Sequence, residues 1–182
     1  MPFVFVTSNK GKAYEAEAIL GRKLEIISVD LDEIQSMDLE KIVRQKAIAA
    51  FEKVRKPLMV DDVAVEVAAW HGFPGPFVKF MVVSVGVLGM MHMMEHVKNR
   101  RVTVKASVGL HDGKNVYTFL GAVSGTIAPS PRGEKGFGWD SIFIPDGQSK
   151  TYAEMTDEEK NAISHRHAVL EKVRTFLETH PI

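Results

Sequence analysis

The sequence predicts a mixed α/β fold in which one β-sheet is flanked by helices. Short β-prone apolar runs alternate with helical stretches in the first half of the chain, and two long β-prone runs separated by a turn fill the middle. Alternating strands and helices form a sheet covered by helices, whereas a strand–turn–strand pattern forms an antiparallel hairpin. The length of 182 residues suits a single domain over residues 1–182.

Three strands and three helices are expected in the first half of the chain. The strands share an apolar, β-prone composition and cover residues 2–7, 24–29 and 58–60. The helices carry apolar residues at helical spacing and cover residues 13–20, 39–54 and 77–97, the last with a break at Gly86 or Gly89. Ser36 or Asp38 can cap the second helix. We expect the strand at 58–60 to end in Asp61–Asp62, before a β-like segment at 63–67.

The second half is predicted to begin with a long hairpin. Its strands cover residues 102–110 and 116–127, joined by a turn at 111–114. A loop over 128–139 and a short strand at 141–144 follow. Thr156, with Glu159 three residues later, forms a capping box. Ser164 can cap a last helix that extends to about residue 179.

The composition excludes several functions. The 23 basic and 23 acidic side chains cancel, whereas a general nucleic-acid binder is usually basic, so no nucleic-acid partner is expected. The absence of cysteine excludes disulfides, thiolate metal sites and a cysteine nucleophile. No signal peptide or membrane span is recognisable, which predicts a cytoplasmic protein without a membrane partner.

A polar turn between the first strand and the first helix is the first candidate site. It consists of Thr7, Ser8, Asn9, Lys10, Gly11 and Lys12. Such a turn directs free backbone N–H groups and a helix dipole at one point, which favours an anion. The spacing is not that of a Walker A loop. The alternative is a capped surface turn with two solvated lysines.

Carboxylates form the second candidate site. Paired acids on a buried strand, Asp61 and Asp62, are costly unless a positive group compensates them, and Mg²⁺ accepts oxygen ligands. A carboxylate beside a metal site can also act as a general base. Glu40 could reach the same metal, and Lys46 could contact phosphate. The alternatives are a turn with capping and solvated acids, a favourable acid in the first turn of a helix, and a solvated lysine.

Two further groups could recognise a base. Aromatic faces in the loop Gly136–Asp140 can stack on a base, with the acid giving direction. Lys160, His165 and Arg166 converge where one helix ends and another begins, and can donate to a carbonyl edge or to phosphate. The alternatives are a loop anchored by two buried aromatics, and ordinary helix capping with surface charge.

The order of these segments resembles the inosine triphosphate pyrophosphatase family, the pyrophosphatases of noncanonical purine nucleoside triphosphates. The matching segments are TSNKGK at 7–12, VDD at 60–62, GFPGPFVKF at 72–80, GFGWD at 136–140 and TYAEMTDEEKNAISHR at 151–166. The resemblance extends from residue 2 to about residue 178.

The resemblance implies a fold and a reaction. The expected fold is an elongated mixed sheet flanked by helices, with two lobes and a central cleft, as in Maf and inosine triphosphatase proteins. The expected reaction is attack of water on the α-phosphorus of ITP, dITP or XTP, which releases the monophosphate and pyrophosphate and cleanses the nucleotide pool. A homodimer and Mg²⁺ are also implied.

The resemblance also assigns roles to residues. It implies that Asp62 is the general base and a metal ligand, with Glu40 as the other ligand. The implied substrate-binding residues are the triphosphate loop Thr7, Ser8, Asn9, Lys10, Gly11 and Lys12, the base platform Phe137, Gly138, Trp139 and Asp140, and the groups Lys160, His165 and Arg166 that read a 6-oxo purine.

One departure from the family pattern leaves alternatives open. Val63–Ala64 stands where many relatives have Ser-Gly, so the contact to substrate would come from the backbone N–H of Val63. The alternatives are a pyrophosphatase for another modified nucleotide, such as a pyrimidine, and a nucleotide-binding protein with weakened catalysis.

Overall fold

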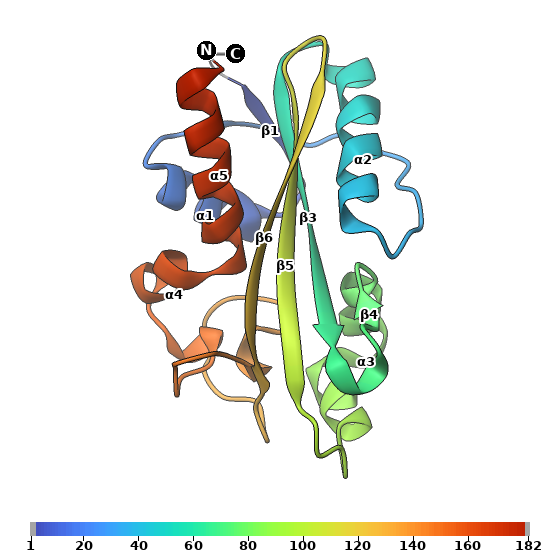
Figure 1. The fold of residues 1–182 in the computed structure, drawn as a ribbon, viewed down its shortest axis with the longest axis vertical. Coiled ribbons are helices and arrows are strands. Elements are labelled where there is room, and N and C mark those ends of the chain that lie inside the picture. The colour runs from blue at the N-terminus through green and yellow to red at the C-terminus, as the bar shows by residue number, and fades with distance from the viewer. Residues whose placement is uncertain (1–2, 181–182) are drawn as a thin grey trace.

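The computed structural model describes residues 3–180. Within these residues, seven strands form one mixed sheet with helices on both faces, as the sequence predicted (Figure 1). The order across the sheet is β2-β1-β3-β5-β6-β7, and β4 pairs with β3 off this path. β1 runs parallel to β2 and β3, whereas the remaining neighbours pair antiparallel.

Most predicted strands are present with shifted ends. The strands are β1 (Val4–Val6), β2 (Glu25–Ile27), β3 (Leu58–Val67), β4 (Pro74–Gly75), β5 (Arg101–His111), β6 (Val116–Ile127) and β7 (Phe143–Pro145). The predicted hairpin of β5 and β6 is confirmed. Residue 2 of the first predicted strand lies outside the described residues. The strand expected at 141–144 begins only at Phe143, because a 3₁₀ turn, η2 (Asp140–Ile142), precedes it.

The helices begin and end at recognisable caps. They are α1 (Lys10–Leu20), α2 (Leu39–Val54), α3 (Val78–Met93), α4 (Asp157–Ile163) and α5 (His165–Thr179). α1 begins earlier than predicted because the Asn9 side chain accepts a hydrogen bond from the N–H of Lys12. Asp38 caps α2, while the capping box at Thr156 and the cap at Ser164 are confirmed. α3 is interrupted at Gly86, where φ is 67°.

The predicted position of the acid pair at the end of a strand is wrong. β3 continues through both acids, which pair with Val108 and Ser107 of β5. Successive side chains of a strand point to opposite faces of the sheet. Asp61 therefore faces α1 and α5, and Asp62 faces α2. Asp61 is tolerated within the strand because cations compensate it, as described below.

Three hydrophobic clusters divide the molecule into two lobes along the long strands β3, β5 and β6 (Figure 1). In the upper lobe, α1 and α5 cover one face of the sheet and α2 covers the other. In the lower lobe, α3 packs with η2 and a second 3₁₀ turn, η3 (Tyr152–Glu154). A third turn, η1 (Ala68–Trp70), follows β3. None of the helices within residues 3–180 is long and apolar enough to cross a bilayer.

Candidate active site

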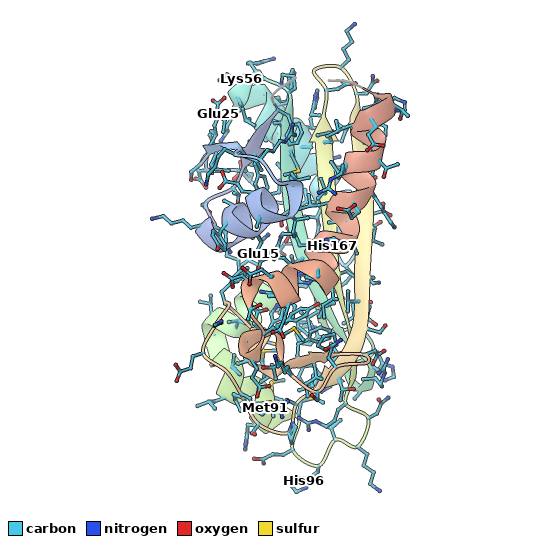
Figure 2. All side chains as sticks on the ribbon, turned by 90° about the vertical axis from the view of Figure 1, so that its left-hand side faces the viewer. Glu15, Glu25, Lys56, Met91, His96 and His167 are labelled. Carbon is cyan, nitrogen blue, oxygen red and sulfur yellow. The ribbon has the colours of Figure 1, made fainter. Side chains whose placement is uncertain are left out.

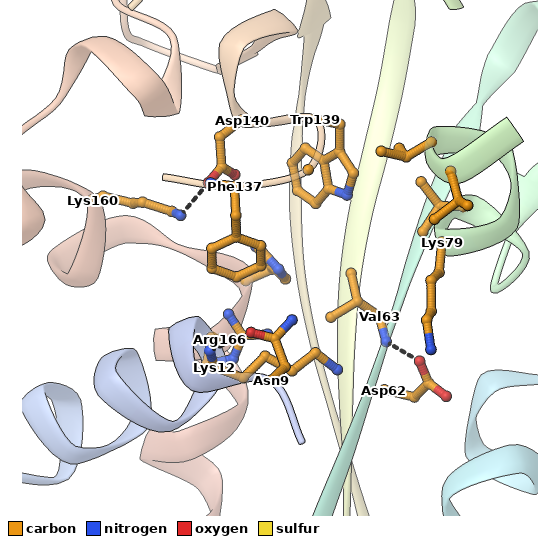
Figure 3. Close-up of a pocket in the computed structure, with 15 residues that line it drawn as sticks. Asn9, Lys12, Asp62, Val63, Lys79, Phe137, Trp139, Asp140, Lys160 and Arg166 are labelled. Carbon is orange, nitrogen blue, oxygen red and sulfur yellow. Dashed lines mark hydrogen bonds and ion pairs between the residues drawn. The ribbon is translucent and has the colours of Figure 1, made fainter. Parts of the chain in front are cut away.

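A pocket of about 330 Å³ lies between the two lobes (Figure 3). Five parts of the chain form it: the turn before α1, the middle of β3, the start of α3, the loop before η2, and the junction of α4 with α5. The predicted site residues that line it are Asn9, Lys12, Asp62, Val63, Phe137, Gly138, Trp139, Asp140, Lys160, His165 and Arg166. Segments far apart in sequence thus meet at one cavity.

Five of the residues to which the resemblance gave a role lie outside this lining. Lys10 and Gly11 line an adjoining pocket of about 310 Å³, which shares Phe137 and Lys160 with the first. Thr7 and Ser8 face the surface beside Lys10, and the Thr7 hydroxyl accepts a hydrogen bond from the N–H of Asn9 at 3.1 Å. Glu40 is exposed in the first turn of α2.

Six buried or nearly buried charges form a connected cluster on the side of the pocket where α1, α4 and α5 meet. The Asp61 carboxylate accepts from Lys12 Nζ at 3.0 Å and from Arg166 Nη2 at 3.1 Å. Glu15 accepts from Arg166 through one oxygen and from Lys160 Nζ through the other, the latter at 2.7 Å. Lys160 also donates to Asp140 at 2.7 Å. Figure 2 shows Glu15 where α1 meets the C-terminal helices. Three cations and three anions leave this cluster neutral.

The charges in this cluster stabilise one another. Burial would raise the pKa of Asp61, but Lys12 and Arg166 lower it to about 2. Burial would lower the pKa of Arg166, but Asp61 and Glu15 raise it. Asp140 differs, because burial raises its pKa more than Lys160 lowers it. Asp61 therefore stays ionised at neutral pH, with both carboxylate oxygens occupied.

His165 is a neutral imidazole with unused hydrogen-bonding capacity. Burial and the neighbouring charges of Arg166 and Lys160 lower its pKa well below the ordinary value. Among the described residues, its Nδ1 has no hydrogen-bond partner, and neither has Nε of Arg166. Buried polar groups are nearly always satisfied, so two unsatisfied atoms in pocket-lining residues favour a polar ligand.

The two aromatics of the GFGWD loop have different environments. The Trp139 side chain is only 8% exposed and packs edge-on against Phe143, with ring centroids 5.7 Å apart. Phe137 is 39% exposed. Its backbone N–H donates to Asp140 at 2.8 Å, which holds the loop closed. Trp139 is therefore a buried wall of the pocket, as the anchored-loop alternative describes, and Phe137 presents an open ring.

Asp62 lies at the opposite end of the pocket from Asp140 and Lys160 (Figure 3). Its Oδ1 accepts from the N–H of Val63 at 2.8 Å, and Nζ of Lys46 lies 3.9 Å from its Oδ2. Lys46 also pairs with Glu33 at 2.6 Å; burial would lower the pKa of Lys46, but Asp62 and Glu33 raise it. The N–H of Val63, expected to contact substrate, is thus engaged by Asp62.

The donor set at this end fits a metal that arrives with a phosphate ligand. Within residues 3–180, no group of three or more His, Asp or Glu side chains is arranged to hold a metal ion alone. Mg²⁺ is commonly held by one or two carboxylates together with substrate phosphates and waters. Asp62 suits such a site because it is partly exposed. Asp61 does not, because Lys12 and Arg166 occupy its oxygens.

Sequence reasoning missed several lining and supporting residues. Glu15 is buried between Lys160 and Arg166, and its signal was its position four residues before the buried Ile19 on the same helix. α3 contributes Val78, Lys79, Val82 and Val83 to the pocket. This helix is apolar on most sides, so its periodicity did not indicate which face would line a site. Figure 3 shows the Lys79 amine directed toward Asp62.

The chain is similar to known proteins along nearly its whole length. Residues 3–176 match the family model described as the Ham1 family. The inosine triphosphate pyrophosphatase of Schizosaccharomyces pombe is 41% identical over 180 residues, covering 97% of this chain and 95% of that protein. The dITP/XTP pyrophosphatase of Hyperthermus butylicus is 39% identical over 166 residues, covering 90% and 87%. The Staphylococcus aureus Ham1 protein superposes with a TM-score of 0.83 at 26% identity, covering 97% and 98%.

Proposed function

Because the chain belongs to the Ham1 family, we propose that it is a nucleoside-triphosphate pyrophosphatase that hydrolyses ITP, dITP and XTP to the monophosphate and pyrophosphate. One structural observation supports the proposal most directly. The pocket has an open aromatic ring and unsatisfied polar atoms at one end, and a partly exposed carboxylate beside lysines at the other. A purine fits the first end, and a phosphate chain fits the second.

The base is recognised at the end of the pocket formed by Phe137, Trp139, His165 and Arg166. The Phe137 ring stacks on the purine, and Trp139 closes the pocket behind it. His165 and Arg166 present N–H groups to the 6-oxo edge of hypoxanthine or xanthine. Adenine carries a 6-amino donor at that position, which would leave these buried donors unpaired. Unpaired buried donors discriminate strongly against the wrong base.

Hydrolysis is assigned to the other end of the pocket. Asp62 accepts a proton from a water molecule as the water oxygen bonds to the α-phosphorus. The bond from this phosphorus to the α–β bridging oxygen breaks, and pyrophosphate leaves with the electron pair. Asp61 cannot take this role, because Lys12 and Arg166 occupy both of its oxygens. Lys79 and Asn9 line the path of the phosphate chain.

Mg²⁺ would be held by Asp62 and Glu40 together with the phosphates. When bound, the metal neutralises phosphate charge and orients the chain. The neutral ion cluster makes this contribution important, since Lys12, Lys160 and Arg166 are already balanced by acids. Glu40 lies in the first turn of α2 and its side chain is exposed. Among the described residues, no buried partner holds this side chain in place.

The test is pyrophosphate release from inosine, xanthosine, adenosine and guanosine triphosphates, with Mg²⁺ and with chelator. We expect Mg²⁺-dependent release confined to the first two substrates. Equal release from adenosine triphosphate would contradict the base recognition, and release in chelator would contradict the metal. A modified pyrimidine triphosphate in the same panel tests the alternative substrate class.

A second candidate is a nucleotide-binding protein with weakened catalysis. Val63–Ala64 favours it, because a Ser hydroxyl is missing and the N–H of Val63 is engaged by Asp62. Thermal unfolding with inosine triphosphate and Ca²⁺ distinguishes the two. Stabilisation without any turnover in Mg²⁺ would support the binder.

We also propose that the chain forms a homodimer through α3. Phe80, Val83 and Leu88 on this helix are 63%, 79% and 74% exposed. Clustered exposed apolar side chains mark protein–protein contacts. Val83 also lines the pocket, so a second copy on this face would shield the site from water. Light scattering should give a dimer mass for the wild type and a monomer mass for Leu88→Lys.

A further inference from the structure

Two glycines lie where helices rest on opposite faces of the sheet. A Cβ atom on Gly121 of β6 would lie 2.4 Å from the backbone N of Val169 and 2.7 Å from the carbonyl O of His165, both in α5. A Cβ atom on Gly109 of β5 would lie 2.6 Å from the carbonyl O of Val43 in α2. These neighbours are main-chain atoms, so rotation of a side chain cannot relieve the contact.

Backbone conformation does not explain either glycine. Both lie in regular strand pairing, Gly121 opposite Ala106 and Gly109 opposite Thr118. Glycine in a strand interior weakens the strand, and often marks a site where another backbone approaches closely. Close approach of the helices is therefore the reason for glycine at these two positions.

Each contact falls beside residues of the pocket. The Gly121 contact includes His165 itself, the first residue of α5, and Arg166 follows it. The Gly109 contact is at Val43, one turn before Lys46, whose Nζ lies 3.9 Å from Asp62. The two glycines thus support opposite ends of the site, the base end through α5 and the Asp62 end through α2.

We propose that Gly121 is a positioning residue for base selection, which acts by letting the start of α5 lie directly on β6, and that Gly109 is its counterpart for the hydrolytic end. This inference rests on the proposed function. An added methyl group at 121 lifts the start of α5 and moves His165 and Arg166 relative to Phe137 and Trp139. A displacement of about 1 Å can change a rate on the order of a hundredfold.

The experiment compares Gly121→Ala with Gly109→Ala. For each variant, kcat and KM are measured with inosine and adenosine triphosphates. Gly121→Ala should reduce the preference for inosine triphosphate by about tenfold or more, mainly through KM. Gly109→Ala should lower kcat and keep the preference. Ala168→Gly loosens the same part of α5 without adding bulk at the strand, so it should keep both parameters near wild type.

Three results would overturn the inference. They are an unchanged preference in folded Gly121→Ala, the same loss of preference in Gly109→Ala, and a similar loss in Ala168→Gly. If Gly121→Ala does not fold, Val169→Leu takes its place, because it adds bulk to the core cluster between α5 and the sheet, at the residue whose backbone N lies against Gly121; an unchanged preference there overturns the inference equally. A wild type without turnover contradicts the proposed function instead, so the two failures are distinguishable.

Discussion

Glu15 and Lys160 lie 145 residues apart in the sequence, yet the Oε1 atom of one accepts a hydrogen bond from the Nζ atom of the other at 2.7 Å. Both side chains are buried, and Glu15 also accepts from Arg166 through its second oxygen. This carboxylate therefore holds two of the cations that line the pocket between the lobes, although Glu15 itself does not line that pocket.

Replacement of Glu15 by Gln should destabilise the protein. Two buried cations would lose a charged partner, and breaking a buried ion pair costs on the order of 3 kcal/mol. The free energy of unfolding from urea titration measures the loss. Glu17→Gln on the same helix is the control, because its partner Lys23 is 91% exposed and solvent screens the pair. An equal loss of unfolding free energy in both variants would show that the buried contacts of Glu15 stabilise the protein no more than an exposed ion pair does.

Asp62→Asn should abolish most turnover while nucleotide binding remains. A general base contributes on the order of 10²–10⁴-fold, so we expect kcat to fall within that range. Isothermal titration calorimetry with inosine triphosphate and Ca²⁺ should still detect binding of the nucleotide to this variant. Asp61→Asn should instead lower stability, because Lys12 and Arg166 lose their shared partner. Unchanged kcat in Asp62→Asn would remove this residue from the mechanism.

Phe137→Ala and Trp139→Ala should differ in what they lose. Phe137 is partly exposed, so its truncation should raise KM for inosine triphosphate and change the unfolding free energy little. Trp139 is a core residue, and its truncation should cost about 3–5 kcal/mol. Steady-state kinetics and urea unfolding of both variants test this contrast. A stable Trp139→Ala protein with only a raised KM would contradict the assignment of Trp139 as a wall.

His165 should make stability fall below neutral pH. Its pKa is lowered in the folded protein, whereas in the unfolded chain it is about 6.5. The unfolded state therefore binds the proton first as the pH falls, and stability decreases by up to about 1.4 kcal/mol per pH unit below about pH 6.5. Stability is restored as the pH rises through this value.

The His165→Asn variant isolates this contribution to pH dependence. His111, whose pKa is also lowered by burial, contributes in the same direction, so the comparison must be between slopes. The free energy of unfolding is measured from about pH 7 down to about pH 5. Over this range it should fall less steeply with decreasing pH in the variant than in the wild type. Parallel slopes would mean that the pKa of His165 is the same in the folded and unfolded states, which contradicts this prediction.

Local patterns in the sequence predicted most elements because their signals are local. The capping box at Thr156, the cap at Ser164 and the β5–β6 hairpin each depend on residues a few positions apart. The start of α1 was misplaced because Asn9 was assigned to the turn as an anion ligand rather than to the cap. The periodicity of a sequence does not show which of two possible roles such a side chain has.

The errors at the site have a different origin. Asp61 and Asp62 were placed at the end of a strand because charged side chains rarely occupy a buried strand interior. Only the long-range partners Lys12 and Arg166 make that position acceptable. Lys160 and Arg166 line the pocket, but their pairing with Glu15 spans 145 and 151 residues of sequence and leaves no local signal.

The ion cluster between α1 and the C-terminal helices also sets an order for synthesis. Glu15 and Asp61 leave the ribosome well before Lys160 and Arg166, their partners. Until then these acids have no buried partner from the last two helices, and the pocket lacks the residues that α4 and α5 contribute to it. A nascent chain ending before α4 should therefore be neither a stable intermediate nor a partial enzyme, and nucleotide binding should appear only after α5 has emerged.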